Sequence, residues 1–143
     1  MKTQSVLRVI DANLNRLAEG LRILEEAARM ILDDTDLTQQ LKNLRHDLVR
    51  NDVPFNIELI QARNSEGDVG ADMEVSGEKK LKDLPLVIIS NSRRVQESLR
   101  VLEEMAKLPE IAPKLDSEKF KKARFEVYLL EQTLIARLTE QQL

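Results

Sequence analysis

Apolar residues recur every three or four positions along most of the chain, which is the spacing of one face of an α-helix. In the first 32 residues this stripe consists of Val6, Ile10, Leu17, Leu21, Leu24, Ala28 and Ile31. The pattern predicts a helix over residues 5–32, with Ser5 as an N-cap whose side chain accepts a backbone N–H. Similar stripes predict helices over residues 36–50, 55–62, 84–107 and 117–139. Strong helix formers dominate the composition, so we expect an all-α fold.

Capping residues support these helix boundaries. Residues 33–35, Asp-Asp-Thr, end the first helix and cap the second. Asp83 caps the fourth helix, whose first turn tolerates Pro85. Residues 116–117, Asp-Ser, cap the last helix. The helices therefore have start signals that are independent of the apolar stripe.

Two of the predicted long helices repeat one another. Residues 13–29 align without a gap with residues 91–107, at an offset of 78, and nine of the 17 aligned residues are identical. The identical pairs are Asn13/Asn91, Arg16/Arg94, Glu19/Glu97, Leu21/Leu99, Arg22/Arg100, Leu24/Leu102, Glu25/Glu103, Glu26/Glu104 and Ala28/Ala106. The helix that follows each copy is also similar, with Leu-Lys-Asn-Leu-Arg-His-Asp at 41–47 and Phe-Lys-Lys-Ala-Arg-Phe-Glu at 120–126.

The repeat predicts the architecture. Long amphipathic helices must bury their apolar stripes against one another, and a pseudo-twofold antiparallel bundle does so. We therefore expect one domain over residues 1–143, built from copies at about 5–50 and 83–139. Apolar edges left by long helices in a small bundle would suit a homodimer.

Composition narrows the chemistry. The chain has no cysteine, which excludes a disulfide framework, a thiolate nucleophile and a Cys-based zinc site. Its single histidine, His46, gives no support to a Ser/His/Asp triad. The net charge of −3 is unlike the basic footprint of a nucleic-acid binder. With no signal peptide and no long apolar run, we expect a cytoplasmic protein that does not enter a membrane.

Two repeated amides stand out. Asn13 and Asn91 both fall within the apolar arc of their helices, where a buried amide without partners costs about 1–3 kcal/mol. One interpretation is that they fix the register of the helices, as a buried Asn does in a coiled coil. The other is that they face an internal polar pocket and bind a ligand.

Charged residues border the same arc in both copies. Arg16 and Glu19 lie at one border of the first copy, as do Arg94 and Glu97 in the second. Ordinary surface ion pairs would contribute only a few tenths of a kcal/mol each. A position beside a buried Asn equally suits a ligand site, so both interpretations stay open.

The connector between the two copies is the remaining candidate. Its sequence from Arg63 to Gly70 reads RNSEGDVG, and two of its glycines flank Asp68. Gly67 and Gly70 would let the backbone approach a ligand and point N–H groups at an anion. Asp68 could hold a hard cation such as Mg²⁺, and Arg63 could pair with phosphate. An ordinary surface turn is the alternative.

Several segments together resemble one known family. They are RVIDANLNRLAEGLRILEE at 8–26, LRHDL at 44–48, GDVG at 67–70, RRVQESLRVLEEMAK at 93–107 and FKKARFEVYLLEQTL at 120–134. In this order they resemble the alternative, monofunctional hydroxymethylpyrimidine phosphate kinase domain of thiamine biosynthesis, often fused ahead of thiamine-phosphate synthase. The resemblance implies transfer of the γ-phosphoryl group of ATP to 4-amino-5-hydroxymethyl-2-methylpyrimidine phosphate, with Mg²⁺ as cofactor. It also implies a functional link to the synthase.

This implied reaction suggests a role for each candidate residue. Phosphoryl transfer requires positioning and charge neutralisation more than covalent chemistry. Arg16, Arg94 and Arg63 would neutralise phosphates. Asp68, with Glu19 or Glu97, would bind Mg²⁺. Asn13 and Asn91 would form hydrogen bonds to the aminopyrimidine or to a phosphate. Asp11 is a candidate for the base that accepts the hydroxyl proton. A non-catalytic helical module that binds or regulates the synthase is the rival reading.

Overall fold

The computed structural model describes residues 2–49, 53–76 and 80–141, and within these ranges it is helical with no strand. The elements are α1 (Lys2–Glu26), the π-helical segment η1 (Ala27–Ile31), α2 (Thr35–Val49), α3 (Val53–Gln61), α4 (Leu84–Met105) and α5 (Ser117–Gln141). The all-α prediction is confirmed. None of the described helices is long and apolar enough to cross a membrane.

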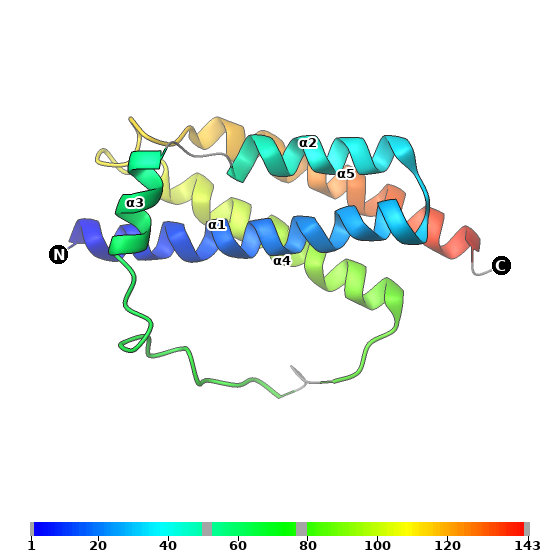
Figure 1. Cartoon of the computed structure of the whole chain (residues 1–143), viewed down its shortest axis with the longest axis horizontal. Helices are drawn as coiled ribbons and strands as arrows, with labels where there is room; N and C mark the ends of the chain where they lie inside the picture. Colours follow the sequence, from blue (N-terminus) through cyan, green and yellow to red (C-terminus); the bar gives the residue numbers. More distant parts are fainter. Residues whose placement is uncertain (1, 50–52, 77–79, 142–143) are drawn as a thin grey trace.

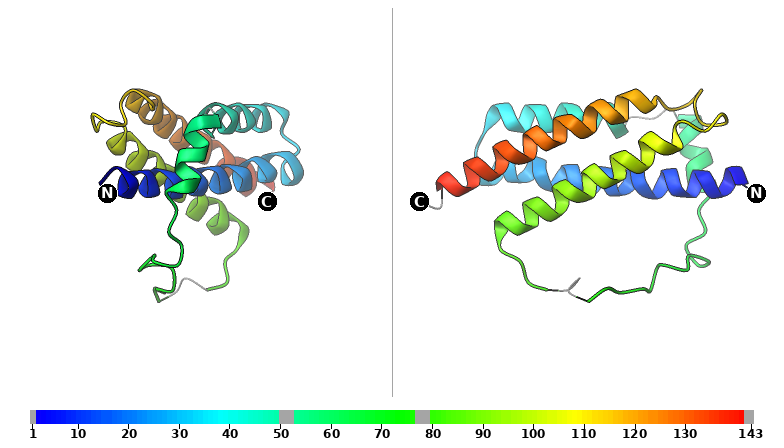
Figure 2. Two further views of the ribbon diagram at one scale, coloured as in Figure 1. Left: turned by 60° about the vertical axis from the view of Figure 1, so that its left-hand side comes forward. Right: turned by 180° about the vertical axis from the view of Figure 1, so that it is seen from behind.

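The helices form two antiparallel hairpins packed against each other. α1 and α2 make the first hairpin, α4 and α5 make the second, and α1 and α4 run in opposite directions (Figure 1, Figure 2). α1 packs extensively on α4, whereas α2 touches α5 only slightly. α3 crosses the N-terminal part of α1, and the connector to α4 hangs away from the bundle on the side opposite α2 and α5 (Figure 1).

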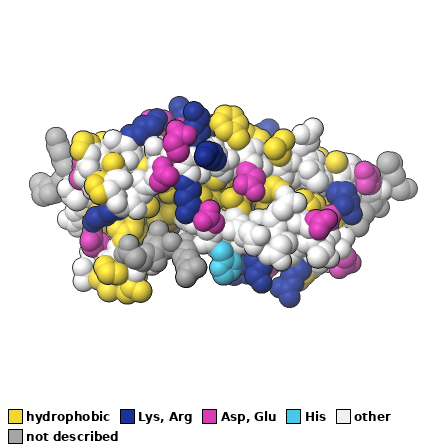
Figure 3. Space-filling model, turned by 90° about the horizontal axis from the view of Figure 1, so that it is seen from above, with side chains coloured by type: hydrophobic (Ala, Val, Ile, Leu, Met, Phe, Trp, Pro, Cys, Tyr) yellow, Lys and Arg dark blue, Asp and Glu magenta, His cyan; other side chains and the backbone are white. Residues whose placement is uncertain are grey.

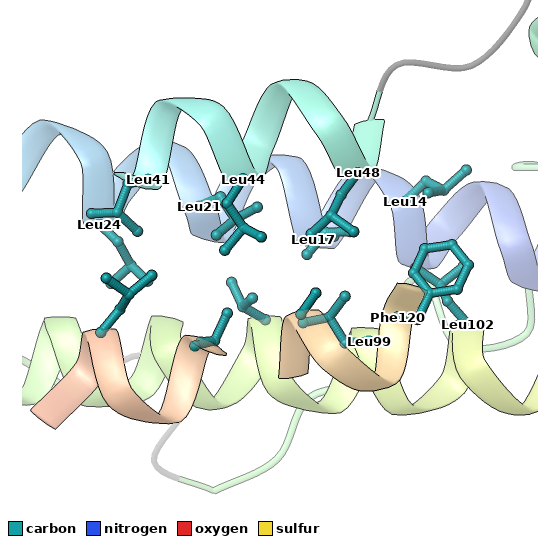
Figure 4. Packing of buried hydrophobic residues seen from close by; sticks show 14 of the residues in the cluster. Leu14, Leu17, Leu21, Leu24, Leu41, Leu44, Leu48, Leu99, Leu102 and Phe120 are labelled. Carbon is teal, nitrogen blue, oxygen red and sulfur yellow. The ribbon is translucent and has the colours of Figure 1, made fainter. Parts of the chain in front are cut away.

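Leucines from all the long helices fill the core. Leu14, Leu17, Leu21 and Leu24 of α1 and Leu41, Leu44 and Leu48 of α2 face Leu99 and Leu102 of α4 and Phe120 of α5 (Figure 4). Many of these side chains, such as Leu17 and Leu99, are fully buried. The apolar residues whose spacing of three or four positions predicted the helices are therefore the residues that form this core.

The crossing of α1 and α4 is unusually close at Gly20. A Cβ atom built on Gly20 would lie 2.5 Å from Cγ2 of Val95 and 3.3 Å from the backbone oxygen of Asn91. Ser98, which is 2% exposed, is the residue of the second copy that corresponds to Gly20. Small residues at both positions let the two backbones approach.

Each hairpin also contains a buried ion pair, and the two pairs correspond. Glu25 is 3% exposed and lies with Oε1 2.9 Å from Nε of Arg45 on α2. Glu103 is 5% exposed and lies 3.1 Å from Arg124 on α5. The similarity of the partner helices therefore reflects a shared carboxylate–guanidinium contact.

Some predicted boundaries were wrong. α1 begins at Lys2, so Ser5 lies inside the helix and does not cap it. The predicted helix over 5–32 changes to π-helical geometry after Glu26, and Asp33 has a φ of 50°. Asp83 does cap α4, because its side chain accepts a hydrogen bond from the backbone N–H of Leu86 at 3.0 Å.

The face formed by α2 and α5 carries charges of both signs. Lys and Arg side chains lie beside Asp and Glu, with hydrophobic atoms between them (Figure 3). Phe125, Tyr128 and Leu129 are the exposed large apolar residues of α5. Hydrophobic atoms are therefore part of this outer surface, and the expected homodimer stays a prediction.

Candidate functional site

An open groove runs between the first four turns of α1 and the start of the connector. Its volume is about 710 Å³, within the range of small-molecule sites. It is lined by Ser5, Arg8, Val9, Asp11, Ala12, Asn13, Asn15, Arg16, Arg63, Asn64, Ser65 and Asp68. The groove thus combines three guanidinium groups, two carboxylates, several amides and an apolar floor.

Asp11 and Arg63 join the two walls of the groove. Nε of Arg63 donates to Oδ2 of Asp11 at 2.7 Å, and Nη2 donates to Oδ1 at 3.0 Å. Asp11 is 9% exposed. The hydrogen bonds and the charge of Asp11 raise the pKa of Arg63 above its ordinary value. The bidentate geometry positions Arg63 while leaving its remaining N–H groups available to a ligand.

Asn13 meets the expectation of a buried amide beside a cavity. It is 6% exposed and lines the groove, and its Nδ2 donates to the backbone oxygen of Val9 at 2.8 Å. Its Oδ1 receives no hydrogen bond from a described residue and is not buried. Asn13 therefore presents an acceptor to the groove.

Asn91 has the same local hydrogen bond in a different setting. Its Nδ2 donates to the backbone oxygen of Val87 at 2.8 Å. The residue is half-buried and lines neither this groove nor the smaller one described below. In both copies the Asn side chain thus donates a hydrogen bond to a backbone oxygen of its own helix, but only Asn13 of the first copy also lines a groove.

Arg16 and Arg8 carry the uncompensated positive charge of the groove. Arg16 is exposed and has no ion pair or hydrogen bond to any residue that the structure describes. Nη2 of Arg8 donates only a long hydrogen bond, 3.4 Å, to the backbone oxygen of Asn64. An anion entering the groove would meet both guanidinium groups without displacing a carboxylate.

The N–H groups of Gly67 and Gly70 are both engaged by side chains of the connector. The N–H of Gly67 donates to Oδ1 of Asn64 at 3.0 Å, and that of Gly70 donates to Oδ1 of Asp68 at 2.9 Å. Anion binding by these two glycines stays a prediction, and it would require both N–H groups to give up their present acceptors. Oδ1 of Asn64 and Oδ1 of Asp68 are the acceptors, and each hydrogen bond closes a local turn.

The three predicted metal ligands lie apart. Asp68 lines the groove, Glu97 lines a smaller groove on α4 and α5, and Glu19 lines neither. Among the described residues, no group of three or more acidic or histidine side chains is arranged to hold a metal. Mg²⁺ binding by Asp68 with Glu19 or Glu97 therefore stays a prediction.

The smaller groove, about 320 Å³, contains a second set of arginines. It is lined by Arg93, Gln96, Glu97, Arg100, Arg124 and Tyr128. Hydrogen bonding to Tyr128 and then to Glu103 raises the pKa of Arg124. Arg94, the counterpart of Arg16, is exposed and lines neither groove. Arg94 and Glu97 therefore do not share the groove of the first copy.

The larger groove accordingly brings together part of the predicted set. It contains Asp11, Asn13, Arg16, Arg63 and Asp68, and not Asn91, Arg94, Gly67, Gly70, Glu19 or Glu97. The sequence interpretation missed Arg8, Asn15, Asn64 and Ser65. A signal was available for Arg8 alone, since it lies four residues before Ala12 and eight before Arg16 on one helical face.

Comparison with known proteins adds the family. The profile of the ThiD2 family matches residues 8–133, which is most of the chain. This chain belongs to the ThiD2 family. The match includes α1 from Arg8 onwards, where most of the groove residues lie, and ends within α5. No solved structure matches this ThiD2 chain.

Curated relatives of this ThiD2 chain are named thiamine-phosphate synthase. The Rhodopirellula baltica protein is 46% identical over 107 residues, covering 74% of this chain and 28% of its own length. The Nostoc punctiforme protein is 39% identical over 140 residues, 96% of this chain and 38% of its own. The Thermosynechococcus vestitus protein is 40% identical over 131 residues, which cover 92% of this chain and 36% of its own length. The chain thus spans less than two fifths of these relatives, and a connection with thiamine biosynthesis is supported.

Proposed function

We propose that this chain is an ATP-dependent kinase that converts 4-amino-5-hydroxymethyl-2-methylpyrimidine phosphate to the diphosphate in thiamine biosynthesis. The observation that carries the proposal is the groove, which gathers Asp11, Asn13, Arg16, Arg63 and Asp68 at one place. Membership of the ThiD2 family and the names of the relatives support the pathway. Phosphoryl transfer needs charge neutralisation and positioning, and the guanidinium and carboxylate groups that line the groove support the proposal in this respect.

The acceptor in this reaction is a phosphate oxygen, which changes the role of Asp11. A phosphate monoester has a second pKa near 6 and is largely ionised at neutral pH. A non-bridging oxygen of the monophosphate attacks the γ-phosphorus of ATP, a new P–O bond forms, and the bond to ADP breaks with its electron pair going to ADP. No hydroxyl proton has to be removed, so Asp11 need not act as a base. Its bidentate contact instead makes it a positioning residue for Arg63.

The other groove residues fit the two substrates. The free acceptor of Asn13 matches the exocyclic amino group of an aminopyrimidine. Mg²⁺ bound to the nucleotide would neutralise the charge of the phosphates, and it usually needs only one or two protein carboxylates. Asp68 is the groove residue that would hold it, since only its Oδ1 is engaged by Gly70.

The direct test is turnover by the purified chain. Incubation with ATP, Mg²⁺ and the pyrimidine monophosphate should release ADP and form the diphosphate, which chromatography resolves. Omitting the pyrimidine substrate controls for simple ATP hydrolysis. If no diphosphate forms with Mg²⁺, Mn²⁺ or Co²⁺, the enzyme proposal is wrong.

Asn13→Ala separates ligand binding from helix register. The kinase proposal predicts at least tenfold lower kcat/KM with the far-ultraviolet circular dichroism and Tm close to those of the parent chain. Arg29→Ala is the matched control, because Arg29 is exposed on η1 and has no partner among the described residues. If Asn13→Ala lowers Tm strongly while kcat/KM is kept, the amide fixes register and does not bind substrate.

A second candidate function rests on the relatives. They are named thiamine-phosphate synthase and are more than twice as long as the part matched here. A helical module that binds or regulates such a synthase would accelerate or inhibit it without consuming ATP. Adding the chain to a separately purified synthase, with no ATP present, distinguishes this function from the kinase.

A further inference from the structure

The charge of the larger groove is unevenly compensated. Of its three arginines, Arg63 is held by the carboxylate of Asp11, at 2.7 Å. Asp68, the other groove carboxylate, accepts from the N–H of Gly70 and makes no ion pair with any described residue. Arg8 and Arg16 therefore remain without a carboxylate partner within the described chain, at the α1 side of the groove.

These two arginines lie on one face of α1 with a small residue between them. Arg8, Ala12 and Arg16 follow at intervals of four residues, which places them nearly above one another. At 1.5 Å per residue the Cα atoms of Arg8 and Arg16 are about 12 Å apart, a span within the combined reach of two arginine side chains. Ala12 projects only a methyl group into the groove, so space is left above it for a group held by both guanidinium groups.

The same arrangement is absent from the second copy. At the offset of 78, Leu86 stands where the first copy has Arg8, and Ser90 stands where it has Ala12. Arg94 keeps the position of Arg16 but lines neither groove. The duplicated helices have therefore diverged in charge at this position, and one such site exists per chain within the described residues.

We infer that Arg8 and Arg16 form a binding site for a phosphate monoester dianion, seated over Ala12. This inference deepens the proposed function, on which it rests: the dianion is the phosphate group of the pyrimidine substrate, which is also the nucleophile. Two positive charges offset the repulsion between this phosphate and the triphosphate of ATP. Asn64 orients Arg8 from the connector through its backbone oxygen.

Binding of inorganic phosphate to the full chain tests the site without turnover. Titration followed by ³¹P NMR or calorimetry should give one saturable site per chain that weakens as NaCl rises. Arg8→Gln and Arg16→Gln should each weaken binding about tenfold, because each removes a charged hydrogen-bond donor. Ala12→Leu should block the site by volume without changing the net charge. Arg29→Gln, with the same charge loss outside the groove, should bind phosphate like the parent chain.

Kinetics then assign the phosphate to one substrate. Arg8→Gln and Ala12→Leu should raise the KM for the pyrimidine monophosphate about tenfold while changing the KM for ATP less than twofold. An equal rise in both KM values, or a rise for ATP alone, would place a nucleotide phosphate there and overturn the assignment. Unchanged phosphate affinity in both variants, with Tm retained, would remove the site itself.

The two proposals fail in distinguishable ways. Saturable phosphate binding that depends on Arg8 and Ala12, combined with no diphosphate formation, would leave the site standing and refute the kinase. Diphosphate formation with unaltered KM values in the Arg8→Gln variant would leave the kinase standing and refute the site. Chemical-shift or melting data on each variant show whether a loss reflects the site or the fold.

Discussion

Gly20→Ala tests the close crossing of α1 and α4 on which the bundle depends. The new methyl carbon would lie 2.5 Å from Cγ2 of Val95, whereas carbon atoms normally stay about 3.5–4.0 Å apart. Val95 is fully buried and β-branched, so its χ1 is stiff within a helix. The new methyl carbon would also lie 3.3 Å from the backbone oxygen of Asn91, so it has little room to move away from Val95 in that direction. The methyl group can therefore be accommodated only if the side chain of Val95 or the helices shift.

Two opposing terms determine the size of the effect. Overpacking of a core costs about 1–3 kcal/mol, and Ala is favoured over Gly within a helix by about 1 kcal/mol. The net expectation is a destabilisation of about 1 kcal/mol, measured by urea unfolding followed by circular dichroism. Ser98→Ala, at the corresponding position of α4, adds no atom and should change the unfolding free energy by less than about 0.5 kcal/mol.

A double-mutant cycle makes the argument specific to this contact. Val95→Ala alone should cost about 2 kcal/mol through the cavity it leaves. The double mutant Gly20→Ala/Val95→Ala should be destabilised by at least about 1 kcal/mol less than the sum of the two single mutants. The reason is that the new methyl group fills part of the cavity left by Val95→Ala. If Gly20→Ala is instead more stable than the parent by about the helix-propensity gain, the position is open and the described crossing is incorrect.

Three further predictions concern the capping and charged residues. Arg45→Met should destabilise the chain by about 2–4 kcal/mol, since it leaves the buried carboxylate of Glu25 without its main partner, and adding Glu25→Leu should restore most of the loss in urea unfolding. Asp83→Ala should cost about 1 kcal/mol and Asp83→Asn much less, because only Ala removes the N-cap acceptor. The hydrogen bond from Lys107 lowers the pKa of Glu104 below 4.5, so this carboxylate stabilises the fold above that pH and ceases to do so as the pH falls through the lowered value. The Tm difference between the parent and Glu104→Gln should accordingly shrink between pH 7 and pH 3, and a difference that grows in acid would contradict the assignment.

The sequence was sufficient for the helices because their cause is local. The apolar stripe that predicted a helix over 84–107 is the side of α4 that carries Leu99 and Leu102 into the core. The cap at Asp83 was predictable because the cap and its N–H lie three residues apart. Residues 33–35 marked where the first helical segment stops, but no residue signature indicated the π-helical turn at Ala27–Ile31.

The candidate site was less predictable because its contacts join distant segments. Asp11 and Arg63 were each singled out, yet their contact spans 52 residues and depends on how α3 returns the chain across α1. The repeat was also misleading in part, because identical residues at Asn13 and Asn91 meet a cavity in one copy only. The connector contributes to this difference, because Arg63, Asn64, Ser65 and Asp68 form one wall of the groove beside Asn13.

The extensive contact between α1 and α4 has a consequence for how the chain is held together. α4 packs about as extensively on α1 as on α5, and the apolar residues of both hairpins belong to one core, so neither half buries its whole apolar stripe by itself. The covalent link between the halves, in contrast, runs outside the bundle (Figure 1). Severing the backbone between Arg63 and Asp83 should therefore yield two fragments that copurify as a non-covalent pair. The present single chain has the organisation expected from tandem fusion of a smaller protein that once assembled with itself.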